Sequence, residues 1–172
     1  MSTKKLGAGM YTIAWIGVLL ILIMLFGDWE EKQRNPNQQV ISNITENGTR
    51  VVSLKRNRYG HYVTSGEING REVTFLLDTG ATDVSIPAGL EKQLALQRGR
   101  AVYYSTANGR ITAYQTSLNN MRIGDIELHN VRASINPHSR DDAILLGMSA
   151  LKQLEFTQRG DTLTIRQIIS PF

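Results

Sequence analysis

A long uncharged apolar segment near the N-terminus divides the chain into two parts that must fold by different rules. Residues 6–27 contain no charged side chain, and as a helix they would be roughly 33 Å long at about 1.5 Å per residue. The hydrocarbon core of a bilayer is about 30 Å thick. We therefore expect a transmembrane anchor over residues 6–27, which leaves one ordinary domain in the rest of the 172-residue chain.

The alternative for this segment is a cleaved signal peptide. A signal peptide has an apolar region of about 7–15 residues followed by small residues at the cleavage site. This run ends instead in Leu-Phe-Gly-Asp-Trp, residues 25–29, which favours the anchor. Because Lys4 and Lys5 precede the segment and acidic residues follow it, residues 1–5 are expected in the cytoplasm and the remaining chain across the membrane.

Composition excludes several classes of function. Two of the 19 basic residues precede the anchor and all 15 acidic residues follow it, so the exported part carries a net charge of +2. A net charge this small does not indicate a basic surface for nucleic acid, and no nucleic-acid partner is expected. The chain has no cysteine, and its three histidines are scattered, so neither disulfides nor a metal site are expected.

Residues 28–50 are polar, rich in Asn and Gln, and show neither helical nor alternating periodicity. We expect this segment to be a tether between the anchor and a folded domain. The folded domain is then residues 51–172.

From residue 51 onward, short β-rich runs alternate with turn signals, which predicts an all-β fold. The first hairpin joins residues 61–68 to residues 71–78 across Asn69-Gly70, a dipeptide favoured in type I′ turns. Three further hairpins are expected, each with a glycine in its turn: residues 107–109, 124–125 and 159–161. Two stretches look helical: residues 87–96 and 148–154. Long crossovers are absent, which argues against a doubly wound α/β sheet.

The stretch LLDTGATDVSIP, residues 76–87, has the pattern of a chemical site. Asp78 ends an apolar strand where the chain leaves a buried sheet, a position where burial and backbone N–H groups tune a carboxylate. Thr79 supplies a hydroxyl that can lock the loop, and Gly80 lets the backbone pass close to a bound group. Asp-Thr-Gly alone is also an ordinary turn tripeptide. Its setting adds weight, because a second apolar strand, residues 143–147, ends in glycine before a short helix.

With these features the chain resembles the retropepsin-like aspartic proteases (clan AA), and specifically their bacterial, membrane-anchored members. The resemblance covers residues 51–172 and is carried by GHYVTSGEINGREVTFLLDTGAT, TANG and LLGMSALKQLEF. It implies an all-β, single-lobe acid-protease barrel with one or two short helices, preceded here by the transmembrane helix.

The resemblance also implies roles for individual residues. Asp78 matches the catalytic aspartate, and the other residues of its active-site loop are Thr79, Gly80 and Ala81. The strand that supports this loop from behind matches Leu145, Leu146 and Gly147. The substrate-covering flap matches the hairpin of residues 103–112, with Tyr103, Tyr104, Ala107, Asn108 and Gly109. The chain departs from viral relatives in having Met148 after the late glycine and fewer glycines in the flap.

The implied activity is that of an aspartic endopeptidase acting on a protein or peptide substrate, with no metal or organic cofactor. Two carboxylates share one proton in this chemistry, and the chain holds one Asp-Thr-Gly and no second. We therefore expect a two-fold homodimer in which each protomer contributes Asp78. Viral relatives use chain termini in their dimer sheet, so residues 162–172 are a candidate interface strand.

The resemblance and the anchor together predict a single-pass protein of the bacterial inner membrane, with a cytoplasmic N-terminus and a periplasmic protease domain. The alternative is a non-catalytic, membrane-anchored peptide-binding or scaffold domain of the same fold. A monomer released by cleavage in residues 28–50 is a third possibility.

Overall fold

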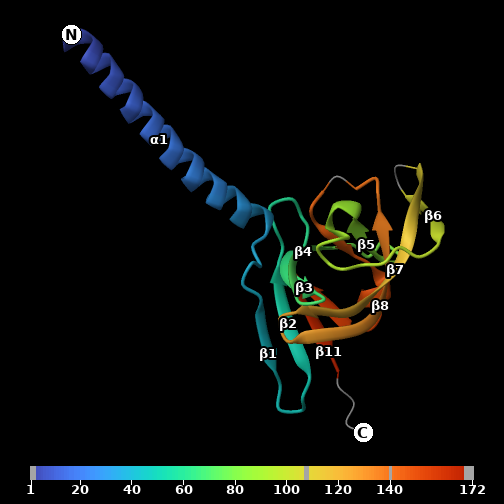
Figure 1. Cartoon of the computed structure of the whole chain (residues 1–172). Coiled ribbons are helices and arrows are strands. Elements are labelled where there is room, and N and C mark those ends of the chain that lie inside the picture. Colours follow the sequence, from blue (N-terminus) through green and yellow to red (C-terminus); the bar gives the residue numbers. More distant parts are fainter. Residues whose placement is uncertain (1–2, 107–108, 140, 169–172) are drawn as a thin grey trace. The chain divides into compact units, whose positions relative to one another are not determined.

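The computed structural model describes residues 3–106, 109–139 and 141–168, and the chain divides into two units, Met1–Arg34 and Asn35–Phe172 (Figure 1). The first unit is helix α1 (Thr3–Arg34). Its part Met10–Arg34 is long enough to cross a membrane and contains an 18-residue window with a mean hydropathy of 2.3. It is the single such helix among the described residues. The helix continues beyond the apolar run because the residues that follow, EEKQR, are good helix formers.

The second unit is built almost entirely from strands. Its elements in chain order are β1 (Ile41–Ile44), β2 (Arg50–Lys55), β3 (Val63–Ile68), β4 (Arg71–Leu77), β5 (Val84–Pro87), the 3₁₀ helix η1 (Ala88–Leu90), β6 (Ala101–Thr106), β7 (Gly109–Ile123), β8 (Ile126–Asn136), β9 (Ile144–Leu146), α2 (Met148–Leu151), β10 (Glu155–Arg159) and β11 (Thr162–Gln167). The predicted all-β class is confirmed.

The larger of two sheets forms the barrel. Its strand order is β3-β4-β9-β5-β8-β7-β6, and a further pairing of β3 with β7 closes six of these strands into a ring. Two pairings are parallel, β4 with β9 and β5 with β8, and they bring segments distant in sequence side by side. Because β9 lies between β4 and β5, the chain segment that joins β4 to β5 must pass the end of β9.

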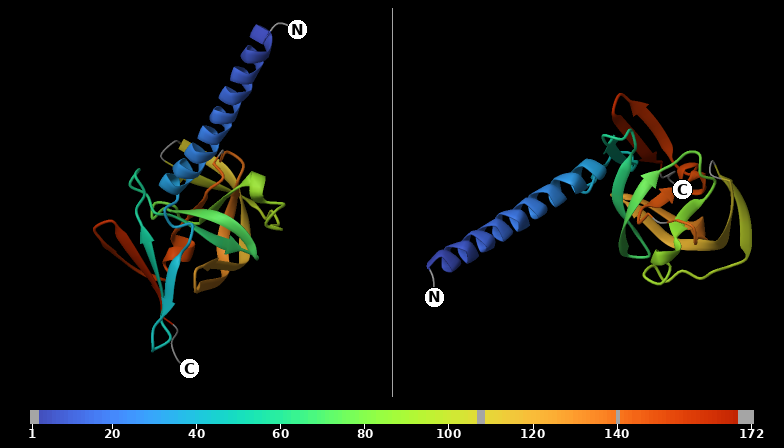
Figure 2. Two further views of the ribbon diagram at one scale, coloured as in Figure 1. Left: turned by 90° about the vertical axis from the view of Figure 1, so that its left-hand side faces the viewer. Right: turned by 90° about the horizontal axis from the view of Figure 1, so that it is seen from above.

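The smaller sheet is formed by one chain alone. Its order is β1-β2-β11-β10, and Figure 2 shows the hairpin of β10 and β11 projecting from the barrel. The sheet differs from the expectation that residues 162–172 form an interface strand, because β11 already has a neighbour on each side, β2 and β10. Residues 169–172 lie outside the described part. Both edges of β11 are thus occupied within the same chain.

The predicted hairpins are present where the structure describes them. Asn69 and Gly70 have φ values of 51° and 74°, as a type I′ turn requires, and join β3 to β4. The turns after β7 and after β10 are also found. Strands β6 and β7 pair up to Thr106 and Gly109, while Ala107 and Asn108 lie outside the described residues.

Both stretches predicted to be helical contain a helix, but each helix is shorter than predicted. Residues 88–90 form η1 and residues 91–95 form turns, and the left-handed φ of 52° at Ala95 ends the helical conformation there. The turn allows the Leu94 carbonyl to accept a hydrogen bond from the Asn69 side chain at 3.0 Å, while Leu94 itself is fully buried. The second stretch contains α2, which is shorter than predicted.

Residues 28–50 differ from a structureless tether. Helix α1 runs to Arg34, and β1 pairs with β2. Asn37 is 5% exposed, and its side-chain amide donates to the carbonyls of Lys55 at 2.9 Å and Val63 at 2.7 Å, while its Oδ1 accepts from the N–H of Lys55 at 2.7 Å. We call Asn37 with these three hydrogen bonds the Asn37 clasp. The polar sequence predicted a tether, but here a buried amide joins the end of β2 to the start of β3.

A single hydrophobic core lies beneath both sheets. Its members come from most of the strands and include many of the largest fully buried side chains: Leu54, Ile68, Phe75, Ile86, Leu118, Met121, Ile144, Leu146 and Ile165. The smaller sheet therefore packs on the barrel rather than forming a separate domain.

Candidate active site

Asp78 lies immediately after β4, at the point where the chain leaves the barrel sheet. The register pairs Leu77 with Leu146 of β9, and the backbone N–H of Asp78 donates to the carbonyl of Leu146 at 3.2 Å. Asp78 is half-buried. Two apolar parallel strands thus fix the backbone position of this carboxylate.

The loop itself orients the Asp78 side chain. The backbone N–H of Gly80 donates to Oδ1 of Asp78 at 2.9 Å, and that of Ala81 donates to the Asp78 carbonyl at 3.2 Å. A Cβ atom at residue 80 would lie 3.2 Å from the same Oδ1, so glycine allows this close approach. Thr79 and Gly80 are exposed, and the carboxylate is therefore held at the surface of the domain.

The segment after β9 supports the loop from behind. A Cβ atom at Gly147 would overlap the backbone oxygen of Asp83 and lie 2.7 Å from that of Ala81, so only glycine fits. The N–H of Met148 donates to the carbonyl of Ala81 at 2.8 Å, and that of Ser149 to the carbonyl of Thr82 at 2.9 Å. These bonds come from the backbone, so they do not depend on which side chain follows the glycine.

The expected supporting residues are not equivalent in the structure. Leu146 and Gly147 lie against the loop, as the preceding contacts show. Leu145 is half-buried and pairs in register with Leu76 of β4 and Ser85 of β5. Its place is in the ladder between the two strands that enter and leave the loop.

A second carboxylate, Asp83, lies at the far end of the same loop and is almost completely buried. Its side chain is 5% exposed. Oδ1 accepts a hydrogen bond from Nε of Arg132 at 2.7 Å, and Oδ2 accepts one from the hydroxyl of Tyr104 at 2.7 Å. Both oxygens of a buried charge are thereby satisfied, as burial requires.

The Tyr104 hydroxyl stays protonated in this environment. Burial raises its pKa most, and the hydrogen bond to the Asp83 carboxylate and its charge raise it further, while the Ser134 hydroxyl and the Arg132 charge lower it. Since the folded-state pKa lies above the unfolded value of about 10, the stabilisation is complete below pH ~10. It is lost as the pH rises through the folded-state pKa.

The hairpin expected to be the flap consists of β6 and the start of β7. Neighbouring residues on a strand face opposite ways, and here Tyr103 is 78% exposed while Tyr104 turns inward to Asp83. Gly109 begins β7 with a φ of 107°. The expected tip residues Ala107 and Asn108 lie outside the described residues.

Three residues of the site were not predicted. Asp83 had a visible signal, because it lies within the LLDTGATDVSIP stretch and directly precedes the buried strand β5. Arg132 and Ser149 had none. Arg132 lies on the alternating strand β8, where a charged residue is expected on the solvent face, and Ser149 looks like an ordinary helical serine.

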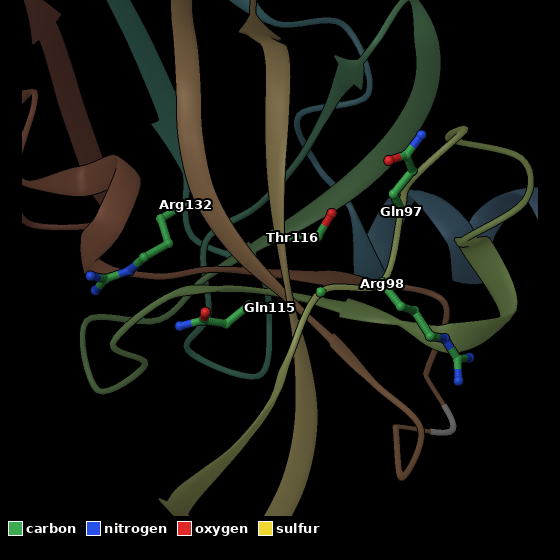
Figure 3. A pocket seen from close by; sticks show the side chains of 6 residues that line it. Gln97, Arg98, Gln115, Thr116 and Arg132 are labelled. Carbon is green, nitrogen blue, oxygen red and sulfur yellow. The ribbon is translucent and has the colours of Figure 1, made fainter.

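A pocket of about 370 Å³ opens beside the site, on β7, β8 and the segment before β6 (Figure 3). It is lined by Gln97, Arg98, Gly99, Gln115, Thr116 and Arg132. Both arginines already have carboxylate partners, since Arg98 donates from Nε to Glu91 at 2.8 and 2.9 Å and Arg132 pairs with Asp83. The lining includes no residue of the Asp-Thr-Gly loop.

The frame of strands, loop and glycine contacts can be compared with known proteins. The sequence model of the family described as "gag-polyprotein putative aspartyl protease" matches residues 64–153, more than half of the chain. The chain belongs to this family. The match contains the Asp78 loop, the hairpin of β6 and β7, and the supporting segment β9 and α2. The predicted membership in the retropepsin-like aspartic proteases is confirmed.

One solved structure supports this retropepsin-like assignment at the level of the fold. The crystal structure of a retropepsin-like aspartic protease from Rickettsia conorii is 25% identical, has a TM-score of 0.59, and covers 74% of this chain and 94% of that chain. The EIAV protease in complex with an inhibitor is 20% identical, with a TM-score of 0.47, and covers 58% of this chain and 92% of that chain. An uncharacterized protein of Sinorhizobium sp, encoded in the cobV 5' region, is 30% identical over 179 residues, which is 96% of this chain and 76% of the relative.

Proposed function

We propose that this retropepsin-like protein is an aspartic endopeptidase that hydrolyses peptide bonds with a water activated between two Asp78 residues of a homodimer. One observation carries the proposal. In a chain of the aspartyl protease family, the carboxylate of the Asp-Thr-Gly loop is half-buried, and the Gly80 N–H orients it at 2.9 Å.

The dimer follows from the chemistry. One carboxylate must be ionised to take a proton from water, and a second must be protonated to donate to the scissile carbonyl. Two carboxylates close together cannot both ionise, so they share one proton and titrate as a pair. Because one chain supplies one Asp-Thr-Gly, a two-fold contact between two chains supplies the pair.

The catalytic cycle uses the chain's own groups throughout. The ionised Asp78 removes a proton from water as the water attacks the peptide carbonyl, and the protonated Asp78 gives its proton to the carbonyl oxygen. The Asp78 that took the proton from water then gives it to the leaving nitrogen, while a hydroxyl of the tetrahedral intermediate returns a proton to the other Asp78 as the C–N bond breaks. The hairpin of β6 and β7 covers the substrate and binds it by strand-like backbone hydrogen bonds, while bulk water is excluded.

We propose the bacterial inner membrane as the location, with α1 as a single-pass anchor and the β-domain in the periplasm. The lysines at positions 4 and 5 precede the apolar run, as the positive-inside rule requires for a cytoplasmic N-terminus. Two chains confined to one membrane meet at a raised effective concentration, which favours the dimer.

The decisive test is Asp78→Asn in the full chain, purified in detergent and incubated with a mixed peptide library. Cleavage should fall by about 10²–10⁴-fold or more, because the amide can neither accept the proton from water nor share one. The dimer fraction in size-exclusion chromatography should be unchanged. Asp161→Asn, which removes only an exposed ion pair with Arg56, is the matched control and should keep full activity.

Undiminished cleavage by Asp78→Asn would exclude the mechanism. The wild-type chain could also bind peptides and yet show no cleavage of the kind that an aspartic-protease inhibitor blocks. That result would identify a non-catalytic peptide-binding domain instead.

A further inference from the structure

We propose that Asp83 is a positioning residue that holds the flap against the active-site loop through the hydroxyl of Tyr104. We call Asp83, Tyr104 and Arg132 the flap latch. The latch sets the resting position of β6 over the substrate site. The inference rests on the proposed function only in naming the hairpin of β6 and β7 a flap.

Strand β6 needs such a contact because of its place in the sheet. In the described strand order it stands last, with β7 as its neighbour, so the ladder holds it along one side. An edge strand of this kind is easily displaced. Tyr104 supplies a bond that leads away from the ladder, to a carboxylate between the Asp-Thr-Gly loop and β5.

The other end of this bond is fixed. The N–H of Val84, next to Asp83, donates to Oγ of Ser149 at 3.0 Å, and that hydroxyl donates to the carbonyl of Arg132 at 2.7 Å. The Asp83 backbone also packs against Gly147 with no room for a side chain. Asp83 therefore cannot follow when β6 moves away from the loop. Such a movement must break the hydrogen bond between the Tyr104 hydroxyl and Asp83.

Arg132 makes the latch reversible. Its Nε pairs with Oδ1 of Asp83, and Tyr104 uses Oδ2, so the two partners do not compete. The arginine side chain is 58% exposed and extends from β8 at the rim of the pocket in Figure 3. When Tyr104 leaves, the buried carboxylate still has its cationic partner, which avoids the large penalty of an unpaired buried charge.

Hydrogen exchange of the full-length protein in detergent tests the latch without reference to catalysis. Tyr104→Phe keeps the ring and removes the hydroxyl. Exchange of the amides of β6 should become about tenfold faster or more, because a hydrogen bond to a charged group is lost. Exchange in β4 and β9 should not change. Tyr59→Phe is the matched control, since it also removes one tyrosine hydroxyl bond, to Arg58, and should leave β6 as in wild type.

Kinetics give the second readout. A flap that rests open more often must be closed by the substrate, so Tyr104→Phe should raise KM about 3–10-fold while kcat stays within about twofold. If the wild-type protein had no protease activity, the proposed function would be wrong. The hydrogen-exchange experiment would still test the latch, because it does not depend on catalysis.

Two results would overturn the latch. One is unchanged exchange of the β6 amides in Tyr104→Phe. The other is faster exchange across the whole β-domain together with a lowered melting temperature, because the hydroxyl would then serve general stability and not the position of the flap.

Discussion

Gly147 is the residue on which the geometry of the active-site loop depends most directly. Its backbone conformation, with φ −89° and ψ −176°, is open to any residue, so the requirement for glycine is steric. A Cβ atom there would meet backbone atoms of Ala81 and Asp83, and backbone cannot turn aside as a flexible side chain can. The loop that carries Asp78 would have to shift as a whole.

Gly147→Ala should therefore destabilise the domain by about 1–3 kcal/mol, the usual cost of overpacking. Differential scanning calorimetry of the full chain in detergent measures this change. Gly89→Ala is the control, because a Cβ atom at residue 89 meets no heavy atom within 4 Å. Equal melting temperatures for the two variants would contradict the steric account.

Single residues of the site could be predicted only where the residues that form it are adjacent in the sequence. Asp78, Thr79 and Gly80 follow one another, and their roles were implied by that one motif. The partnership of Asp83 with Arg132 joins positions 49 residues apart, and it depends on β5 and β8 lying parallel in register. No local pattern in the sequence specifies that pairing.

Among the elements, the hairpins were predictable and the parallel pairings were not. Alternation and turn chemistry determine β3 with β4 and β10 with β11, since both partners and the turn lie within one short stretch. Parallel pairing of β4 with β9 brings together strands that are far apart in sequence. The Asn37 clasp was missed for a different reason: its segment is polar, and polarity alone cannot distinguish a solvated amide from a buried, fully bonded one.

Asn37→Ala should cost the domain about 1–3 kcal/mol or more, because it leaves the carbonyls of Lys55 and Val63 and the N–H of Lys55 without this partner. The change should lower the calorimetric melting temperature of the β-domain. Asn43→Ala, at an exposed position of β1, is the control and should stay within about 0.5 kcal/mol of wild type. A matching loss in both variants would mean that the clasp adds nothing specific.

For the whole molecule, the central proposal is that activity belongs to a pair of chains. A chain with Asp78→Asn that still folds should then inactivate a wild-type partner. With a tenfold molar excess of the variant, random pairing should lower the activity of a fixed amount of wild-type protein by about tenfold, since few wild-type chains find each other. Co-reconstitution of both chains into the same vesicles, followed by a peptide-cleavage assay, measures this.

Asp161→Asn in the same excess is the control for added protein in the vesicle. Because this variant keeps its own activity, total cleavage should rise with the added chains instead of falling. If the excess of the Asp78→Asn chain left the cleavage activity unchanged, one wild-type chain would be sufficient for activity.

The smaller sheet has a consequence for the order of events in the cell. Both neighbours of strand β11, β2 and β10, belong to the same chain. The smaller sheet can therefore form within one chain, with no strand from a second chain. Folding is then a first-order process, whereas pairing is second-order. At low abundance, the activity of the proposed protease would rise with the square of its copy number per membrane area. A small change in gene expression would then change the rate of proteolysis by a larger factor.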